Sequence, residues 1–131
     1  MKALTIVASA GALLCTFVLA SAQDIPKGNH YVCYPVKVET FKQRTATFVD
    51  QFGTWKMTVI KPVQLCTPAE KRIEKTVFPM IDPKLHVLCY EVKYEGKTPP
   101  KVQVTDQFGV LKMGLNPATT VCLPASKLVL K

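Results

Sequence analysis

The chain has 131 residues, with 17 Lys and Arg against 9 Asp and Glu, a formal net charge of +8. This length allows one domain, or two very small ones that share a core. A hydrophobic content of 48% argues against a disordered or low-complexity chain. The sequence has no glycine-rich strand-to-helix turn, which excludes a dinucleotide-binding α/β domain.

Residues 1–22 have the pattern of a secretory signal peptide. Lys2 supplies the positive start, residues 3–20 are almost wholly apolar, and Ala20-Ser21-Ala22 is a small-x-small cleavage pattern. We therefore expect cleavage before Gln23, with an uncleaved membrane anchor as the alternative.

Cleavage would leave a single β domain, 23–131, with a formal charge of +7 because only Lys2 is lost. No second apolar run is long enough to span a membrane, so we expect a secreted or periplasmic protein without a membrane span. An even cysteine count in a short exported chain predicts two disulfides. The four remaining cysteines are Cys33, Cys66, Cys89 and Cys122.

The chain contains an internal duplication. A shift of 56 residues aligns 30–69 with 86–125 and gives 15 identities at 40 positions without a gap, where chance gives about 2 or 3. The sequence therefore divides into repeat 1 (about 30–69), a linker (about 70–85) and repeat 2 (about 86–125).

Each repeat has three stretches in which apolar and polar residues alternate, a pattern that predicts half-buried strands. Phe48 corresponds to Val104 and Trp55 to Leu111, so the apolar face is kept in both copies and is predicted to face a core. The six stretches are 32–38, 46–48 and 55–59 in repeat 1, and 88–94, 102–104 and 111–115 in repeat 2.

The connections carry their own signals. Asp-Gln-Phe-Gly at 50–53 and 106–109 predicts a hairpin turn, because Asp can bond the backbone two residues on and Gly can take a positive φ. Thr67-Pro68-Ala69-Glu70 is a capping-box pattern, which predicts a short helix through about Lys75.

These patterns predict an all-β fold of two pseudo-twofold repeats. Each repeat contributes about three antiparallel strands to one sandwich or small barrel, and a short helical linker joins them. We expect a joint core, because one three-stranded sheet leaves its apolar face uncovered.

Four cysteines allow three pairings. The repeat favours Cys33 with Cys66 and Cys89 with Cys122, each closing a loop of about 33 residues and stabilising by roughly 3–4 kcal/mol. The crossed pairing, Cys33 with Cys122 and Cys66 with Cys89, also respects the symmetry.

The two histidines, His30 and His86, are the candidates for a ligand or titrating role, each three residues before a cysteine. Zinc sites usually have close cysteine pairs, and blue-copper loops place His and Met just after the cysteine; neither pattern occurs in the sequence. We predict no metal and no other cofactor.

No catalytic constellation stands out, and we predict that the protein is not an enzyme. Ser126, the only serine after cleavage, lacks a glycine elbow, and paired cysteines are not nucleophiles. Asp50 and Asp106 form a conceivable carboxylate dyad, but the residues after them differ from the aspartic-protease pattern and a turn explains each Asp.

The basic residues are scattered and mostly lysine, which argues against nucleic-acid binding. A diffuse basic surface keeps a protein soluble or draws it to anionic cell-surface polymers. The candidate contact loops are the two turns, with Asp50, Phe52, Asp106 and Phe108.

The motif His-x-x-Cys-Tyr-x-Val-Lys begins at His30 and again, as far as Lys93, at His86, and each is followed by Asp-Gln-Phe-Gly and Cys-x-Pro. This pattern resembles a family of secreted bacterial cysteine-containing tandem repeats of unknown function, over nearly all of 30–125. The resemblance implies a disulfide-linked, β-rich extracellular module and brings no catalytic residues. Pro117 departs from the first copy and is predicted to end the third strand of repeat 2 early.

The expected function is that of a non-catalytic, secreted, disulfide-stabilised β-repeat module. Its expected partner is an anionic cell-surface polymer or another envelope protein. The alternative is a structural subunit of an envelope or extracellular assembly, joined through open sheet edges. A metal or redox protein is the third and least favoured interpretation.

Overall fold

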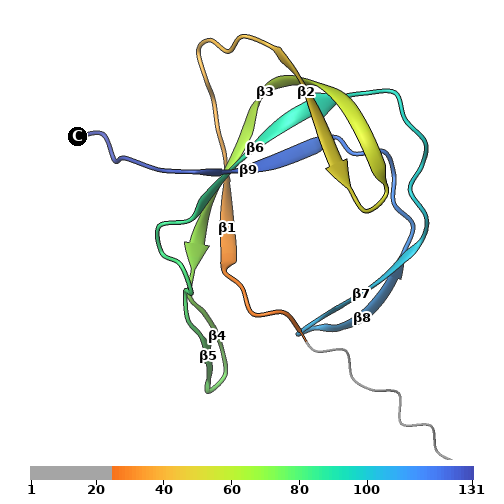
Figure 1. Ribbon diagram of the computed structural model, residues 1–131. Coiled ribbons are helices and arrows are strands. Elements are labelled where there is room, and N and C mark those ends of the chain that lie inside the picture. Colours follow the sequence, from red (N-terminus) through yellow and green to blue (C-terminus); the bar gives the residue numbers. More distant parts are fainter. Residues whose placement is uncertain (1–24) are drawn as a thin grey trace, which may run out of the picture.

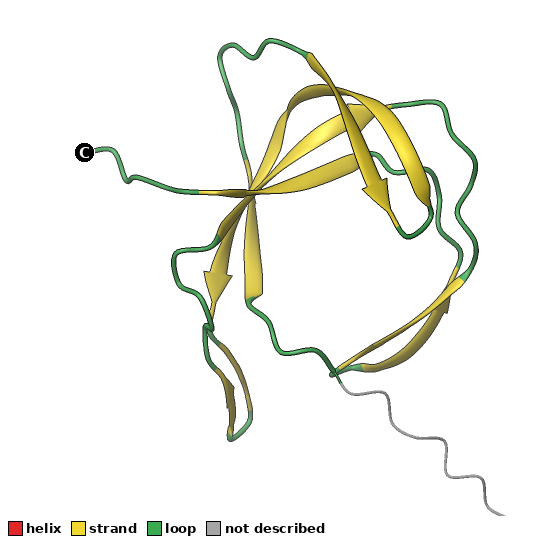
Figure 2. Ribbon diagram, viewed as in Figure 1, coloured by secondary structure: helices red, strands yellow, loops and turns green. Residues whose placement is uncertain are grey.

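The computed structural model describes residues 25–131, so the expected signal peptide, 1–22, lies outside the described residues. The described part contains nine strands and no helix (Figure 2), which confirms the all-β prediction. The strands are β1 (His30–Pro35), β2 (Arg44–Asp50), β3 (Gly53–Ala69), β4 (Lys71–Ile73), β5 (Thr76–Phe78), β6 (His86–Lys93), β7 (Val102–Asp106), β8 (Gly109–Met113) and β9 (Thr120–Ala125).

The 17-residue strand β3 organises the main sheet, whose order is β1-β3-β6-β9 with β2 also paired to β3. All pairings are antiparallel. Val59 pairs with both β2 and β6, and Cys66 pairs with both β1 and β6. Strands β1 and β2 therefore lie end to end along one edge of β3, and β6 of the second repeat lies along the other (Figure 1).

The pairings repeat with the sequence. The β1–β3 ladder corresponds to the β6–β9 ladder, and the β2–β3 hairpin corresponds to the β7–β8 hairpin. Even the bond just beyond each ladder is duplicated: the Val36 amide donates to the Val63 carbonyl at 3.1 Å, and the Val92 amide to the Thr119 carbonyl at 3.0 Å. The β3–β6 ladder has no counterpart in the described part of the chain, because it joins one repeat to the next.

The counterpart of β3 in repeat 2 is broken into two strands. Strand β8 ends at Met113 and β9 begins at Thr120, which confirms the early end expected from Pro117. Residues 114–119 correspond to 58–63, where β3 pairs with β6. The second copy thus has a proline that interrupts a ladder, and among residues 25–131 it has no following strand to pair with.

The two disulfides join Cys33 to Cys66 and Cys89 to Cys122, with Cα separations of 3.9 and 4.0 Å. Each links residues directly opposite each other in a ladder. In the crossed pairing, Cys33 and Cys122 would have to meet across two intervening strands, about 14 Å apart, beyond disulfide reach.

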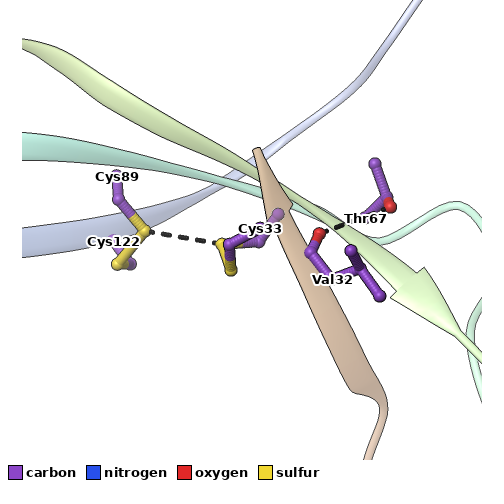
Figure 3. The surroundings of a disulfide bond; sticks show 6 residues. Val32, Cys33, Thr67, Cys89 and Cys122 are labelled. Atoms are coloured by element: carbon purple, nitrogen blue, oxygen red, sulfur yellow. Dashed lines mark hydrogen bonds between the residues drawn. A yellow bond between two sulfur atoms is a disulfide. The ribbon is translucent and has the colours of Figure 1, made fainter. Parts of the chain in front are cut away.

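The two bridges also touch each other. The Sγ atoms of Cys66 and Cys89 are 3.9 Å apart (Figure 3), and neither carries a hydrogen, so this is a contact between oxidised sulfurs. These two cysteines are 5% and 2% exposed, which places the contact in the middle of the sheet.

A joint core forms at the junction of the repeats, as expected. Met57 and Val59 of β3 and Val92 of β6 are buried there. Trp55 of repeat 1 packs on Tyr94 of repeat 2, with ring centroids 5.4 Å apart. The half-buried residues around this centre are Phe41, Ala46, Phe48, Trp55, Tyr90, Tyr94 and Val121.

The predicted helix in the linker is wrong. Cys66 is tied to β1, and residues 67–69 continue the β1–β3 ladder instead of starting a helix. Glu70 pairs with Arg72 at 2.6 Å rather than capping, and the chain then forms the β4–β5 hairpin, with Glu74 in a left-handed conformation (φ 51°). Ladder pairing overrides the local capping signal.

The predicted inward face of the second hairpin is also wrong. Val104 and Leu111 are 41% and 54% exposed, whereas their counterparts Phe48 and Trp55 pack on the core. In Figure 1 the β7–β8 ribbon stands apart from the main sheet, and the described strands do not close into a barrel. The sheet instead has outer edges, at β1 and β9, that no other described strand covers.

The repeats supply a matched test of the core. We expect Met57→Ala to lower the free energy of unfolding by about 2–5 kcal/mol, because it empties a buried site. Met113→Ala, at the corresponding half-buried position on the separate hairpin, should cost less than about 1 kcal/mol. Guanidinium denaturation with both disulfides intact measures both values, and equal losses would contradict a core centred on the repeat junction.

Candidate functional site

The two Asp-Gln-Phe-Gly turns have the predicted form. Asp50 pairs with Gly53 and Asp106 with Gly109 across two-residue loops. Both glycines have positive φ, 153° and 134°, which residues with a side chain rarely adopt. The Asp50 carboxylate accepts hydrogen bonds from the amides of Phe52 and Gly53, at 2.9 and 3.1 Å.

The first turn is also held by Trp55, whose indole N–H donates to Asp50 at 2.9 Å. This bond, followed by the Phe52 amide bond, holds the pKa of Asp50 below its usual value. Phe52 lies half-buried beside a pocket of about 260 Å³ that Asp50, Trp55 and Tyr94 also line. Structure, rather than ligand binding, accounts for every polar contact of this turn.

The second turn is more open. Asp106 accepts a bond from the Phe108 amide at 2.8 Å, and Leu111 stands where the first copy has its indole donor. Phe108 is 76% exposed, whereas Phe52 of the first turn is half-buried. Asp106 lines a different cavity from the one that Asp50 lines, so the structure does not bring the two carboxylates into one site.

The two histidines occupy unlike environments. His86 is buried, and its Nδ1 lies 2.9 Å from the Lys84 carbonyl; because a carbonyl only accepts, Nδ1 carries the proton. His30 packs edge-on against Phe78, with centroids 5.6 Å apart, and its Nε2 lies 3.3 Å from Gln107 Oε1. The Nδ1 atom of His30 is buried without a hydrogen-bond partner.

His30 lies in a cleft of about 790 Å³ where three separated parts of the chain meet. The residues before β1 (25–29) form one side, the end of β5 with Phe78 a second, and the second turn (105–107) a third. Figure 1 shows the chain before β1 reaching the end of the β7–β8 ribbon. The sequence separation of 77 between His30 and Gln107 shows that only the tertiary fold creates this cleft.

A lysine stands beside this cleft. The Nζ of Lys71 lies 4.4 Å from the centroid of the Phe78 ring and 5.3 Å from that of Phe108. This amine is buried and has no hydrogen-bond acceptor among the described residues. Two aromatic faces therefore hold the cation from β4 next to the second turn.

Within residues 25–131, no group of three or more His, Cys, Asp or Glu is arranged to hold a metal ion.

Two repeats, each with one internal disulfide and one Asp-Gln-Phe-Gly hairpin, agree with the result of a family comparison. The family model described as "Repeat of unknown function (DUF7450)" matches residues 1–124. The chain belongs to this family. No curated protein and no solved structure matches it significantly.

In this DUF7450 protein, the sequence predicts some of the residues in and beside the cleft but not all of them. His30, Asp106 and Phe108 were candidates, and the structure brings them to one region. Lys71 and Phe78 are not among the predicted site residues, because the capping pattern predicts a helix through about Lys75, whereas the structure pairs these two residues in the β4–β5 hairpin. The signal for a hairpin was present: β-branched Ile73, Thr76 and Val77 favour strands over helix.

Trp55→Phe tests the electrostatics of the first turn. The variant removes the indole donor, so we expect the pKa of Asp50 to rise toward its usual value, as followed by NMR titration of its carboxyl group. The depressed pKa means that Asp50 stabilises the fold above its unfolded pKa and loses this contribution as the pH falls through the folded pKa. Tyr94→Phe keeps the donor and should leave the titration unchanged; an unchanged pKa in Trp55→Phe would contradict the assigned cause.

Proposed function

We propose that this repeat protein is a non-catalytic binding module, secreted or periplasmic, whose cleft beside the second turn binds an anionic cell-surface polymer. The carrying observation is the Lys71 amine, buried between two phenylalanine rings without a hydrogen-bond acceptor. Burying an ammonium without an acceptor is costly, and an anionic ligand would supply the missing partner.

The cleft also offers an acceptor. With Gln107 Oε1 accepting from His30 Nε2, the Nδ1 atom of His30 holds a free lone pair. The Phe78 ring contacts both His30 and Lys71, so the free acceptor and the free donor border one apolar surface. A polymer of acidic sugars carries hydroxyl donors, anionic acceptors and apolar ring faces, and so complements all three features.

The cysteines support the proposed compartment. Two disulfides indicate an oxidising environment, since cytosolic thiols are kept reduced. In the described part of the chain, no helix has the length and apolar character needed to span a membrane. Secretion is supported further by the signal-peptide pattern at 1–22.

A structural role is the second candidate function, and the free edges of β1 and β9 favour it. An open edge presents unpaired amides and carbonyls to any strand that approaches. In this role the protein would be a subunit of an envelope or extracellular assembly.

The polymer proposal is tested with heparin as a soluble polyanion probe and with isolated cell envelopes. We expect retention at low salt that declines steeply as salt is raised. Lys71→Gln should lower the eluting salt concentration well below that of the wild type, because it removes the unpaired amine. Lys56→Gln removes the same charge from an exposed position on β3 outside the cleft and is the matched control.

Equal shifts in the two variants would mean that retention reflects only the diffuse positive charge. No retention of the wild type at low salt would sink the polyanion proposal.

A further inference from the structure

The β3–β6 ladder joins repeat 1 to repeat 2 inside the chain. Both β3 and β6 have a corresponding strand in the other repeat, and in each of these the edge that would form the same ladder is uncovered. Strand β9 corresponds to the end of β3, but it pairs with β6 alone in the described part of the molecule. Strand β1 corresponds to β6, but among residues 25–131 it pairs with β3 alone. The molecule therefore presents one half of the same interface at each end of its sheet.

We propose that the chain associates head-to-tail with a second copy of itself, the outer edge of β9 pairing with the outer edge of β1 in the register of the β3–β6 ladder. This inference uses the open edges of the structural role proposed above and is independent of polymer binding in the cleft. The contact is heterologous, because two different surfaces meet, and repetition gives a ring or a filament.

The internal ladder gives the register by the 56-residue shift. Gln64 faces Cys89 and Cys66 faces Val87. The corresponding contacts between copies set Thr120 opposite Cys33 and Cys122 opposite Tyr31, with Val121 opposite Val32 between them.

Backbone geometry agrees with this register. The disulfide partners, with Cα atoms 3.9 and 4.0 Å apart, have the close spacing of non-hydrogen-bonded antiparallel pairs. The N–H and C=O groups of Cys33 and Cys122 therefore point away from their partners, toward the free edges. The same holds two residues away, at Tyr31 and Thr120. All four residues that the register requires to bond between copies present free backbone groups.

The side chains agree as well. Trp55 packs on Tyr94 inside the chain, and the corresponding contact joins Leu111 of one copy to Val38 of the next. Leu111 is 54% exposed and Val38 47% exposed, so both halves of an apolar contact lie uncovered. Val104, the counterpart of core-packed Phe48, is exposed on the same hairpin.

The copies' interface lacks one stabilising feature of the internal one. The Lys61–Glu91 ion pair, at 3.6 Å, corresponds to Pro117 and Pro35, which carry no charge. Association between molecules also costs translational and rotational entropy that the internal ladder does not. We therefore expect reversible, concentration-dependent assembly.

Sedimentation velocity of the purified, oxidised protein, from about 1 μM to about 1 mM, tests the proposal. The wild type should grow beyond a monomer as concentration rises. Thr120→Pro removes an outward amide from β9, and Tyr31→Pro removes one from β1, so each variant alone should associate at least tenfold more weakly. Thr120→Val and Tyr31→Phe keep the amides and should assemble like the wild type.

Mixing the two proline variants gives the sharpest outcome. Thr120→Pro retains a working β1 edge and Tyr31→Pro a working β9 edge, so the mixture should form a one-to-one heterodimer that grows no further. Self-association of either variant alone as strong as that of the wild type would show a symmetric contact and overturn the head-to-tail proposal. If the proline variants fail to fold, Leu111→Asp and Val38→Asp take their places in the same scheme, since both positions are exposed.

Amide exchange adds a residue-level readout. Raising the wild-type concentration should slow exchange at Tyr31, Cys33, Thr120 and Cys122, whose amides face the free edges. A wild type that stays monomeric throughout overturns self-association. If isolated envelopes still retain that monomer and Thr120→Pro or Tyr31→Pro abolishes the retention, the structural role stands with another partner.

Discussion

The ladder between β3 and β6 is the contact on which the rest of the structure depends. It runs across the junction of the repeats, and the residues buried beside it, Met57, Val59 and Val92, come from both copies. Neither repeat has such a core alone, because a few strands leave their apolar face open. The disulfides lie on either side of this ladder: one joins β1 to β3, the other joins β9 to β6, and their sulfurs meet across it.

One sequence unit therefore gives two different local structures. The hairpin of repeat 1 is covered by Tyr94 from the next repeat, whereas the hairpin of repeat 2 has no following repeat in the described residues and leaves Leu111 exposed. The difference does not come from the turns, which share Asp, Gly and the same register. It comes from position in the chain, so the surface of the second copy differs from that of the first at its hairpin.

Periodicity and duplication were enough to predict the all-β class, the hairpin turns and the early end of β8. They could not show which apolar faces are covered, because alternation identifies an apolar face but not the element that packs on it. Val104 and Phe48 occupy the same position in the pattern, yet only Phe48 packs on the core. The linker failed for a related reason. Its capping signal is local. The disulfide between Cys66 and Cys33 spans 33 residues and holds the β1–β3 ladder, which continues through the predicted helix start. The cleft combines segments 77 residues apart, and no local pattern reports such a meeting.

The free edges are a consequence of the duplication, whereas the cleft depends on segments that are not duplicated. The β3–β6 ladder forms once within residues 25–131, and the 56-residue shift identifies β9 and β1 as the strands whose corresponding edges stay uncovered. The cleft has no counterpart in repeat 1: it needs the β4–β5 hairpin, which occurs between the repeats, and the chain before β1. Lys71 belongs to that unrepeated segment, and it reaches the exposed Phe108 of the second turn. The duplication thus built the scaffold and its ends, while the linker supplied Lys71, whose unpaired donor lies near the unpaired acceptor of His30.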